Sequence, residues 1–179
     1  MRRRCLPICA VLYCELTLFF VKSIVFRIQI RYNIKKEMRR NTQLIQVIYG
    51  AKGTGKTKQI VDHANEYAKT AKGVVVYVDR SNHRLHDLHR NVRLVDASYY
   101  DLKSQHDILS FIKGMLAANF DIDKIYIDGV TRLLDCNVSE LAELYNGLEV
   151  ISNEHNVNFV ITASGAKEEL PDFILKHVS

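Results

Sequence analysis

The sequence predicts an α/β fold of three layers, in which helices cover both faces of a mainly parallel sheet of about five strands. The main observation is that short apolar segments rich in β-branched residues alternate with longer segments of helical period. One apolar segment, Val74–Val78, is hydrophobic at every position, which is typical of a parallel strand buried on both faces. A glycine-rich segment, residues 50–57, joins the first apolar segment to the first helical one.

The expected elements follow one another in a regular order. Strands are predicted at residues 44–49, 74–78, 92–95, 125–128 and 159–163, and helices at 57–72, 80–90, 102–119, 137–151 and 171–178. Asn137, with Glu140 three residues later, forms a capping-box pattern at the start of one helix, and Gly73 is expected to cap the end of another. Strands that alternate with helices in this way predict a parallel sheet.

Composition and charge describe an ordinary globular protein. The chain has 179 residues, 47% of them hydrophobic and 25% charged, as expected for one domain with a substantial core. The net charge of +5 is uneven, because residues 1–37 carry +6 and residues 38–179 carry −1. The overall basicity is therefore no indication that residues 38–179 bind nucleic acid. Cys136 is the one cysteine of that part, which excludes an internal disulfide there and favours a reducing cytoplasm.

The segment Gly50–Thr57 matches the phosphate-loop (Walker A) pattern G-x-x-x-x-G-K-T. The pattern is short, but an apolar strand segment before it and an amphipathic helical segment after it make it specific. Glycines let the backbone curl with its N–H groups pointing inward, and the start of the following helix adds positive partial charge. The segment therefore predicts a phosphate site with contacts from Gly50, Ala51, Lys52, Gly53, Thr54, Gly55, Lys56 and Thr57.

Three side chains are expected to act on a bound nucleotide. Lys56 is expected to reach the β- and γ-phosphates and to take part in catalysis, and the Thr57 hydroxyl to hold Mg²⁺. Asp128 ends the apolar strand 125–128 and is the second expected Mg²⁺ ligand, acting through the water shell of the ion. The chain lacks an Asn-Lys-x-Asp guanine motif, so the sequence favours ATP over GTP.

With this loop and Asp128, the chain resembles the P-loop NTPases, and within them the additional-strand class that includes RecA-like and AAA-type ATPases. The resemblance covers nearly all of residues 44–165. It implies that the strand after Asp128 lies between the strand that leads into the loop and the strand that ends at Asp128. It also implies a polar residue at the end of the inserted strand that senses the γ-phosphate, a position that Ser164 or Thr162 occupies here.

The chain departs from this resemblance at the residue that activates water. Such ATPases usually carry a glutamate directly after the Walker B aspartate or at the end of a neighbouring strand, whereas Gly129 follows Asp128 here. Asp79, at the end of the strand 74–78, is then the acidic candidate for the general base. Hydrolysis is accordingly expected to be slow or to need a partner.

Residues 1–37 differ from the rest of the chain. Arg2–Arg4 precede an apolar run over residues 5–21, which has the basic start of a signal peptide without a convincing cleavage site. A membrane anchor through residues 5–30 is an alternative, although the run has about the minimum length for a span. We favour a later start of translation, because the strand before a phosphate loop is usually the first element of its domain. The candidate first residues are Met1, Met38 and Leu44.

The sequence therefore predicts a cytoplasmic, Mg²⁺-dependent ATP-binding protein that hydrolyses ATP, formed by a leader of residues 1–37 and a P-loop domain of residues 38–179. One alternative is a small-molecule or nucleoside kinase with the arginine-rich residues 80–93 as a lid, although the zinc-binding cysteines usual in thymidine kinases are absent. A second alternative is a regulatory module that binds ATP with little turnover.

Besides the nucleotide, the expected partners are another protein or further copies of the chain. The sequence gives no strong indication that the chain binds nucleic acid. A membrane becomes a partner only if residues 1–37 belong to the protein. Three histidines at intervals of three are interpreted as a solvated polar face rather than a metal site; they are His83, His86 and His89.

Overall fold

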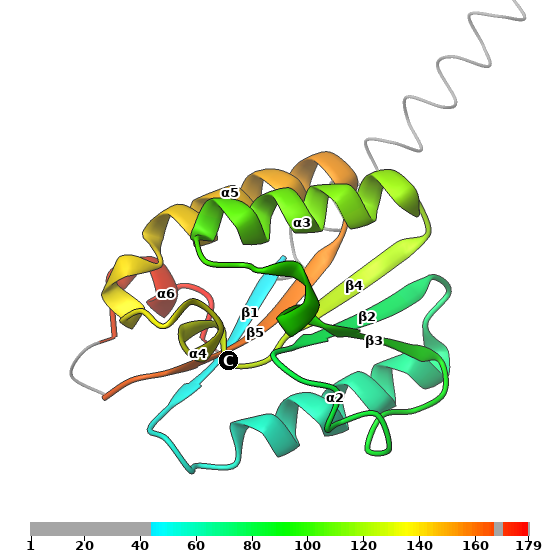
Figure 1. Cartoon of the computed structure of the whole chain (residues 1–179), viewed down its shortest axis with the longest axis horizontal. Coiled ribbons are helices and arrows are strands. Elements are labelled where there is room, and N and C mark those ends of the chain that lie inside the picture. The colour runs from blue at the N-terminus through cyan, green and yellow to red at the C-terminus, as the bar shows by residue number, and fades with distance from the viewer. Residues whose placement is uncertain (1–43, 167–169, 179) are drawn as a thin grey trace, which may run out of the picture. The chain divides into compact units, whose positions relative to one another are not determined.

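Alternating strands and helices build an α/β fold around a parallel sheet in the computed structural model, which describes residues 44–166 and 170–178 (Figure 1). The strands of the sheet are β1 Ile45–Gly50, β2 Val74–Asp79, β3 Val92–Asp96, β4 Ile122–Ile127 and β5 Asn158–Ser164. The α-helices are α2 Lys56–Thr70, α3 Gln105–Ala118, α4 Val130–Leu134, α5 Ala142–His155 and α6 Asp172–Leu175. The predicted fold class is confirmed.

The strands of the described chain lie in the order β1-β5-β4-β2-β3, and each neighbouring pair is parallel. β5 therefore lies between β1, which leads into the glycine-rich loop, and β4, which ends just before Asp128. The resemblance to the additional-strand NTPases implies this insertion. Because parallel strands end at the same edge of a sheet, the loop, Ser164, Asp128 and Asp79 come together at the carboxyl edge.

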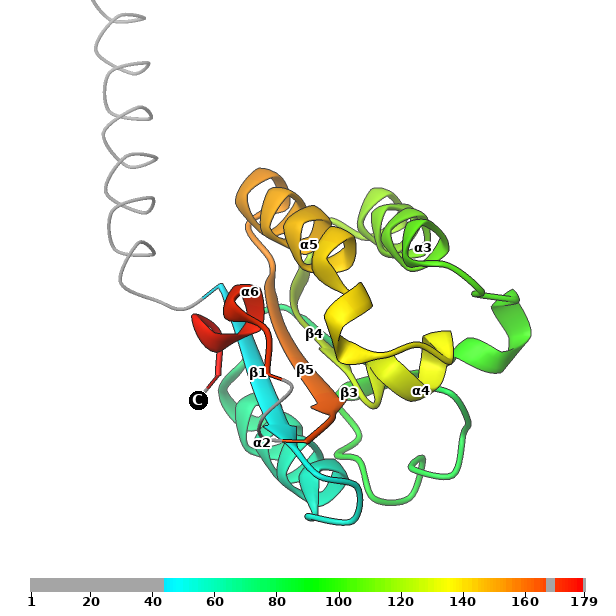
Figure 2. The ribbon, with the colours of Figure 1, turned by 90° about the vertical axis from the view of Figure 1, so that its left-hand side faces the viewer.

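Helices cover both faces of the sheet, with α2 on one face and α3 and α5 on the other (Figure 2). The side chains of β2 alternate between the two interfaces: Val75 and Tyr77 pack in the α2 core, and Val76 and Val78 pack in the opposite core. This alternation explains why every position of the segment 74–78 is apolar, since both faces of the strand are buried. Helices therefore pack against both faces of the sheet whose carboxyl edge carries the glycine-rich loop and Asp128.

Leu148 lies at the centre of the core between α5 and the sheet and has no exposed surface. Replacing it with alanine should lower the free energy of unfolding by about 3 kcal/mol, because the cavity cannot close around the lost methyl groups. Urea unfolding followed by circular dichroism measures this change. Val150→Ala on the exposed side of the same helix is the control and should change the stability by less than about 0.5 kcal/mol. Equal effects of the two substitutions would contradict the described core.

The prediction of a helix at residues 80–90 is wrong, because this segment forms a series of turns. Its backbone bonds span three residues, from the N–H of Leu85 to the carbonyl of Asn82 and from the N–H of Asp87 to the carbonyl of Arg84. Serine, asparagine and aspartate side chains compete with helical hydrogen bonds and favour turns. The short apolar face of this segment favours a helix, but its polar side chains favour turns more strongly.

Several predicted boundaries also change. α3 begins at Gln105 rather than at residue 102, because Ser104 and Asp107 form a capping box. The capping box of Asn137 and Glu140 is confirmed, but it opens a short 3₁₀ turn at Val138–Glu140, and α5 follows at Ala142. β4 begins three residues before the predicted strand, and the helix predicted at 171–178 is limited to α6. The short helix α4 was not predicted.

Gly73 does not cap a helix, since α2 ends at Thr70 and its cap residue is Ala71. A Cβ atom on Gly73 would lie 2.3 Å from the carbonyl oxygen of Asp121, so the glycine permits a close approach of two chain segments. No helix in the described part of the chain combines the length and the apolar character that crossing a membrane requires. The predictions of a signal peptide, a membrane anchor or a later start for residues 1–37 fall outside the residues that the structure describes.

Candidate phosphate-binding site

The glycine-rich loop takes a backbone conformation that its glycines permit. Gly53 has a φ of 89° and Gly55 a φ of 81°, both in the left-handed region that residues with a Cβ atom rarely adopt. Gly55 is the residue before α2, so the loop leads directly into the first turn of that helix. The unbonded N–H groups of a first helical turn, and the helix dipole, favour an anion at this point.

Lys56 lies under the loop and is only 8% exposed. Its Nζ donates hydrogen bonds to the carbonyl oxygens of Gly50 at 2.9 Å and Ala51 at 2.7 Å. Burial lowers the pKa of Lys56, and the negative charge of Asp128 opposes that shift. The ammonium group is thus held at the base of the loop, where phosphates would bind.

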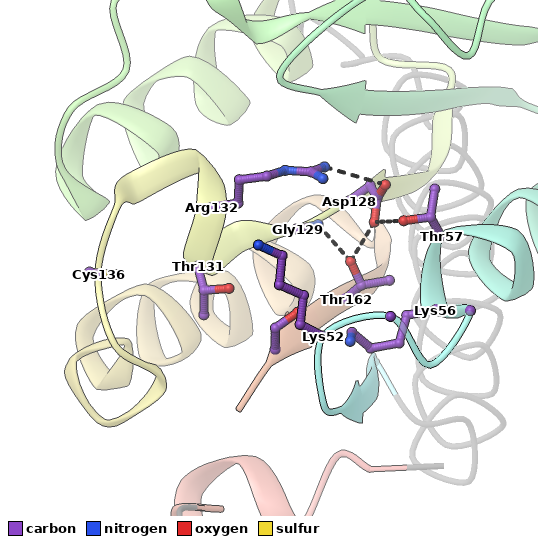
Figure 3. Close-up of a pocket in the computed structure, with 12 residues that line it drawn as sticks. Lys52, Lys56, Thr57, Asp128, Gly129, Thr131, Arg132, Cys136 and Thr162 are labelled. Atoms are coloured by element: carbon purple, nitrogen blue, oxygen red, sulfur yellow. Dashed lines mark hydrogen bonds and ion pairs between the residues drawn. The ribbon is translucent and has the colours of Figure 1, made fainter. Parts of the chain in front are cut away.

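Asp128 directly follows β4 and is 2% exposed, and its Oδ1 atom connects this strand end to β5 and α2. Oδ1 accepts a hydrogen bond from Thr162 Oγ1 at 2.6 Å and one from Thr57 Oγ1 at 3.3 Å (Figure 3). Thr162 Oγ1 in turn accepts the N–H of Gly129 at 2.6 Å, so its position is fixed from two sides. The Oδ2 atom of Asp128 accepts no hydrogen bond from the described residues.

The hydroxyl of Thr57 and the carboxylate of Asp128 form an oxygen-only donor set. Mg²⁺ prefers oxygen ligands and usually keeps several of its waters, so one hydroxyl and one carboxylate are sufficient protein groups. The buried Oδ2 atom without a hydrogen-bond donor is the group that such an ion and its waters would satisfy. These residues therefore fit a magnesium site.

Asp79 ends β2, beside β4, and is 4% exposed. Its Oδ1 accepts the N–H of Arg80 at 2.7 Å and a guanidinium N–H of Arg132 at 3.2 Å. Burial raises the pKa of Asp79, an effect that the Arg80 hydrogen bond opposes and the charge of Asp128 increases. Asp79 lies close to Asp128 but outside the lining of the pocket described next.

A pocket of about 550 Å³ opens at the carboxyl edge of the sheet. Most of its lining residues were predicted to belong to the site. Both Thr162 and Ser164, the two candidates for the residue that senses the γ-phosphate, are among them. The predicted loop residues Gly50, Ala51 and Thr54 do not line it. The lining residues are Lys52, Gly53, Gly55, Lys56, Thr57, Asp128, Gly129, Thr131, Arg132, Cys136, Thr162 and Ser164.

Four lining residues were not predicted, namely Gly129, Thr131, Arg132 and Cys136. All of them belong to the stretch that follows Asp128, where the chain turns back at Gly129 and enters α4. Arg132 is the one charged side chain among these four residues, and its NH2 atom is 3.7 Å from Oδ2 of Asp128. The only signal in the sequence is its spacing, because Arg132 follows Asp128 by four residues.

The arginine-rich residues 80–93 contribute no side chain to the pocket lining. Arg80 reaches the site indirectly, since its NH1 donates to the main-chain carbonyl of Arg132 at 3.1 Å. Within the described ranges, no cluster of three or more histidine, cysteine, aspartate or glutamate side chains could hold a metal ion, and this includes the three histidines of this segment.

Comparison with protein-family models and with curated proteins gives no match. Among solved structures, the chain is similar to the flagellar accessory protein FlaH from Methanocaldococcus jannaschii, with a TM-score of 0.48 and 16% sequence identity. The match covers 75% of this chain and 66% of FlaH. The chain therefore spans just under two thirds of the length of that protein.

Proposed function

We propose that the chain binds ATP with Mg²⁺ and hydrolyses it. One observation carries this proposal: the glycine-rich loop with Lys56 and Thr57 and the buried carboxylate of Asp128 line one pocket, where Thr57 Oγ1 lies 3.3 Å from Asp128 Oδ1. A positively charged group next to a pair of oxygen ligands is what a magnesium–triphosphate needs. The order of the strands supports the same class of nucleotide-binding protein.

The residues of the chain have separate roles in this proposal. The loop amides and Lys56 hold the phosphates, and Thr57 and Asp128 hold the metal ion. A bound Mg²⁺ would neutralise negative charge on the phosphates. Thr162 and Ser164, at the end of β5, are the residues that would detect the γ-phosphate, and the hydrogen bond between Thr162 and Asp128 supports a link to the metal site.

Asp79 is the proposed general base for the attacking water. Its support is that burial raises its pKa, which makes the carboxylate a better proton acceptor, and that it ends the strand next to β4. Asp79→Asn should lower the rate of ATP hydrolysis about 100-fold and leave the affinity for ATP within about threefold, since a general base acts only in the chemical step. The exposed Asp121→Asn is the control. Unchanged hydrolysis by Asp79→Asn would exclude this role.

The function is tested with purified full-length protein, Mg²⁺ and ATP labelled at the γ-phosphate. Release of free phosphate, with or without added nucleosides or DNA, is the expected result. Transfer of the label to a nucleoside would support the kinase instead. Tight binding of ATP with neither product would support a regulatory module, for which Gly129 in place of a glutamate is the favouring observation. Absence of any ATP binding would exclude all three functions.

A further inference from the structure

Arg132 connects two buried carboxylates that end neighbouring strands. Its NH2 atom lies 3.2 Å from Oδ1 of Asp79 and 3.7 Å from Oδ2 of Asp128. The Asp79 and Asp128 side chains are 6% and 2% exposed, whereas the Arg132 side chain is 54% exposed. The guanidinium is directed at Asp128 (Figure 3), while more than half of the Arg132 side chain is exposed and the residue lines the pocket.

Gly129 makes this position of Arg132 possible. Its φ of 66° turns the chain directly after Asp128, so that α4 brings Arg132 back over the strand end. A Cβ atom on Gly129 would lie 2.9 Å from the NH2 atom of Arg132, in the space that the guanidinium occupies. The absence of a side chain at Gly129, directly after Asp128, therefore leaves room for the Arg132 guanidinium, which places a positive group next to Asp128.

The acids use little of the hydrogen-bonding capacity of Arg132. A guanidinium has five N–H donors, and within the described residues one side-chain hydrogen bond, to Asp79, engages them. The contact with Asp128 at 3.7 Å is an ion pair that is too long for a hydrogen bond. Among the pocket-lining residues, the positive side chains are those of Lys52, Lys56 and Arg132, and Arg132 is the one beside Asp128.

We propose that Arg132 binds the terminal phosphate of ATP and thereby distinguishes ATP from ADP; this inference rests on the proposed function. The loop amides engage phosphates that ADP also carries, and Lys56 is expected to reach the β-phosphate of ADP as well as the γ-phosphate of ATP. The γ-phosphate lies toward the metal-binding side of such a site, which is the side where Asp128 positions Arg132. The planar fork of a guanidinium matches the oxygens of a phosphate, and the contact is charge-assisted. The two acids keep the guanidinium at the edge of the pocket, ready for this contact.

The test compares the affinities of the wild-type protein and of Arg132→Met for a non-hydrolysable ATP analogue and for ADP, by isothermal titration calorimetry. Arg132→Met should weaken binding of the ATP analogue at least about 10-fold and change binding of ADP less than about threefold. Arg93→Met replaces an exposed arginine outside the pocket lining and should change neither affinity. Loss of both affinities in equal proportion, or of neither, would overturn the proposal.

A second variant separates the phosphate contact from a structural effect of Arg132. Arg132→Lys keeps the positive charge near the two acids and loses the planar fork, so it should fold normally and still lose part of the ATP preference. Thermal unfolding without nucleotide checks that each variant is folded. If the wild-type protein binds neither nucleotide, the proposed function fails as well. If it binds both and Arg132→Lys and Arg132→Met keep the wild-type ratio of affinities, only the role of Arg132 fails.

Discussion

Replacing Lys56 with alanine should lower the affinity of the chain for ATP about 100-fold, which corresponds to about 2.7 kcal/mol of lost charge-assisted hydrogen bonding. Nζ of Lys56 donates to two carbonyl oxygens at the start of the loop, so the ammonium group already lies at the backbone that we propose binds the phosphates. Alanine supplies neither charge nor donor. The loop amides and the start of α2 remain, so weak binding of phosphate should persist.

Titration of a fluorescent ATP analogue into the two proteins measures this difference. Lys58→Ala, two residues further along α2 and exposed, is the matched control for loss of a lysine charge and should bind ATP like the wild-type protein. A melting temperature of Lys56→Ala close to that of the wild type ensures that lost affinity does not reflect unfolding. Wild-type affinity in a folded Lys56→Ala protein would mean that the loop is not the phosphate site.

The glycine-rich loop and the strands were predictable from local patterns, whereas the insertion of β5 between β1 and β4 was implied by the resemblance to the additional-strand NTPases. Glycines at fixed spacing between a strand and a helix leave few other conformations, and continuous β-branched segments indicate strands that are buried on both faces. Asp128 followed from its position at the end of such a strand. The choice between Thr162 and Ser164 was open, and the structure shows that Thr162 bonds to Asp128 while both residues line the pocket.

Arg132 was not predictable from the sequence for a physical reason. Its place beside two acids depends on the left-handed turn at Gly129, and glycine in a sequence permits such a turn without requiring it. Asp79 is 53 residues away along the chain, so its ion pair with Arg132 exists only once β2 and β4 are paired. The turns at residues 80–90 were missed because their polar side chains compete with helical bonds.

Replacing Asp128 with asparagine should lower the Mg²⁺-dependent rate of ATP hydrolysis at least about 100-fold, because metal-assisted charge stabilisation contributes several kcal/mol to such reactions. Asparagine has the same shape and can still accept the 2.6 Å hydrogen bond from Thr162, so the strand end should keep its structure. It lacks the negative charge that would hold the ion. The amide NH₂ of asparagine would replace Oδ2 near the guanidinium of Arg132. Because both groups are hydrogen-bond donors, the present ion pair would be lost.

The measurement that isolates this effect is the dependence of hydrolysis and of ATP binding on Mg²⁺ concentration. In excess EDTA, Asp128→Asn and the wild type should bind ATP within about threefold of each other, since the loop and Lys56 are unchanged. Added Mg²⁺ should then strengthen binding by the wild type only. Asp62→Asn removes an exposed carboxylate of α2 and should follow the wild type throughout. A full magnesium response in Asp128→Asn would show that another residue holds the ion, because the buried carboxylate would then have no role in binding it.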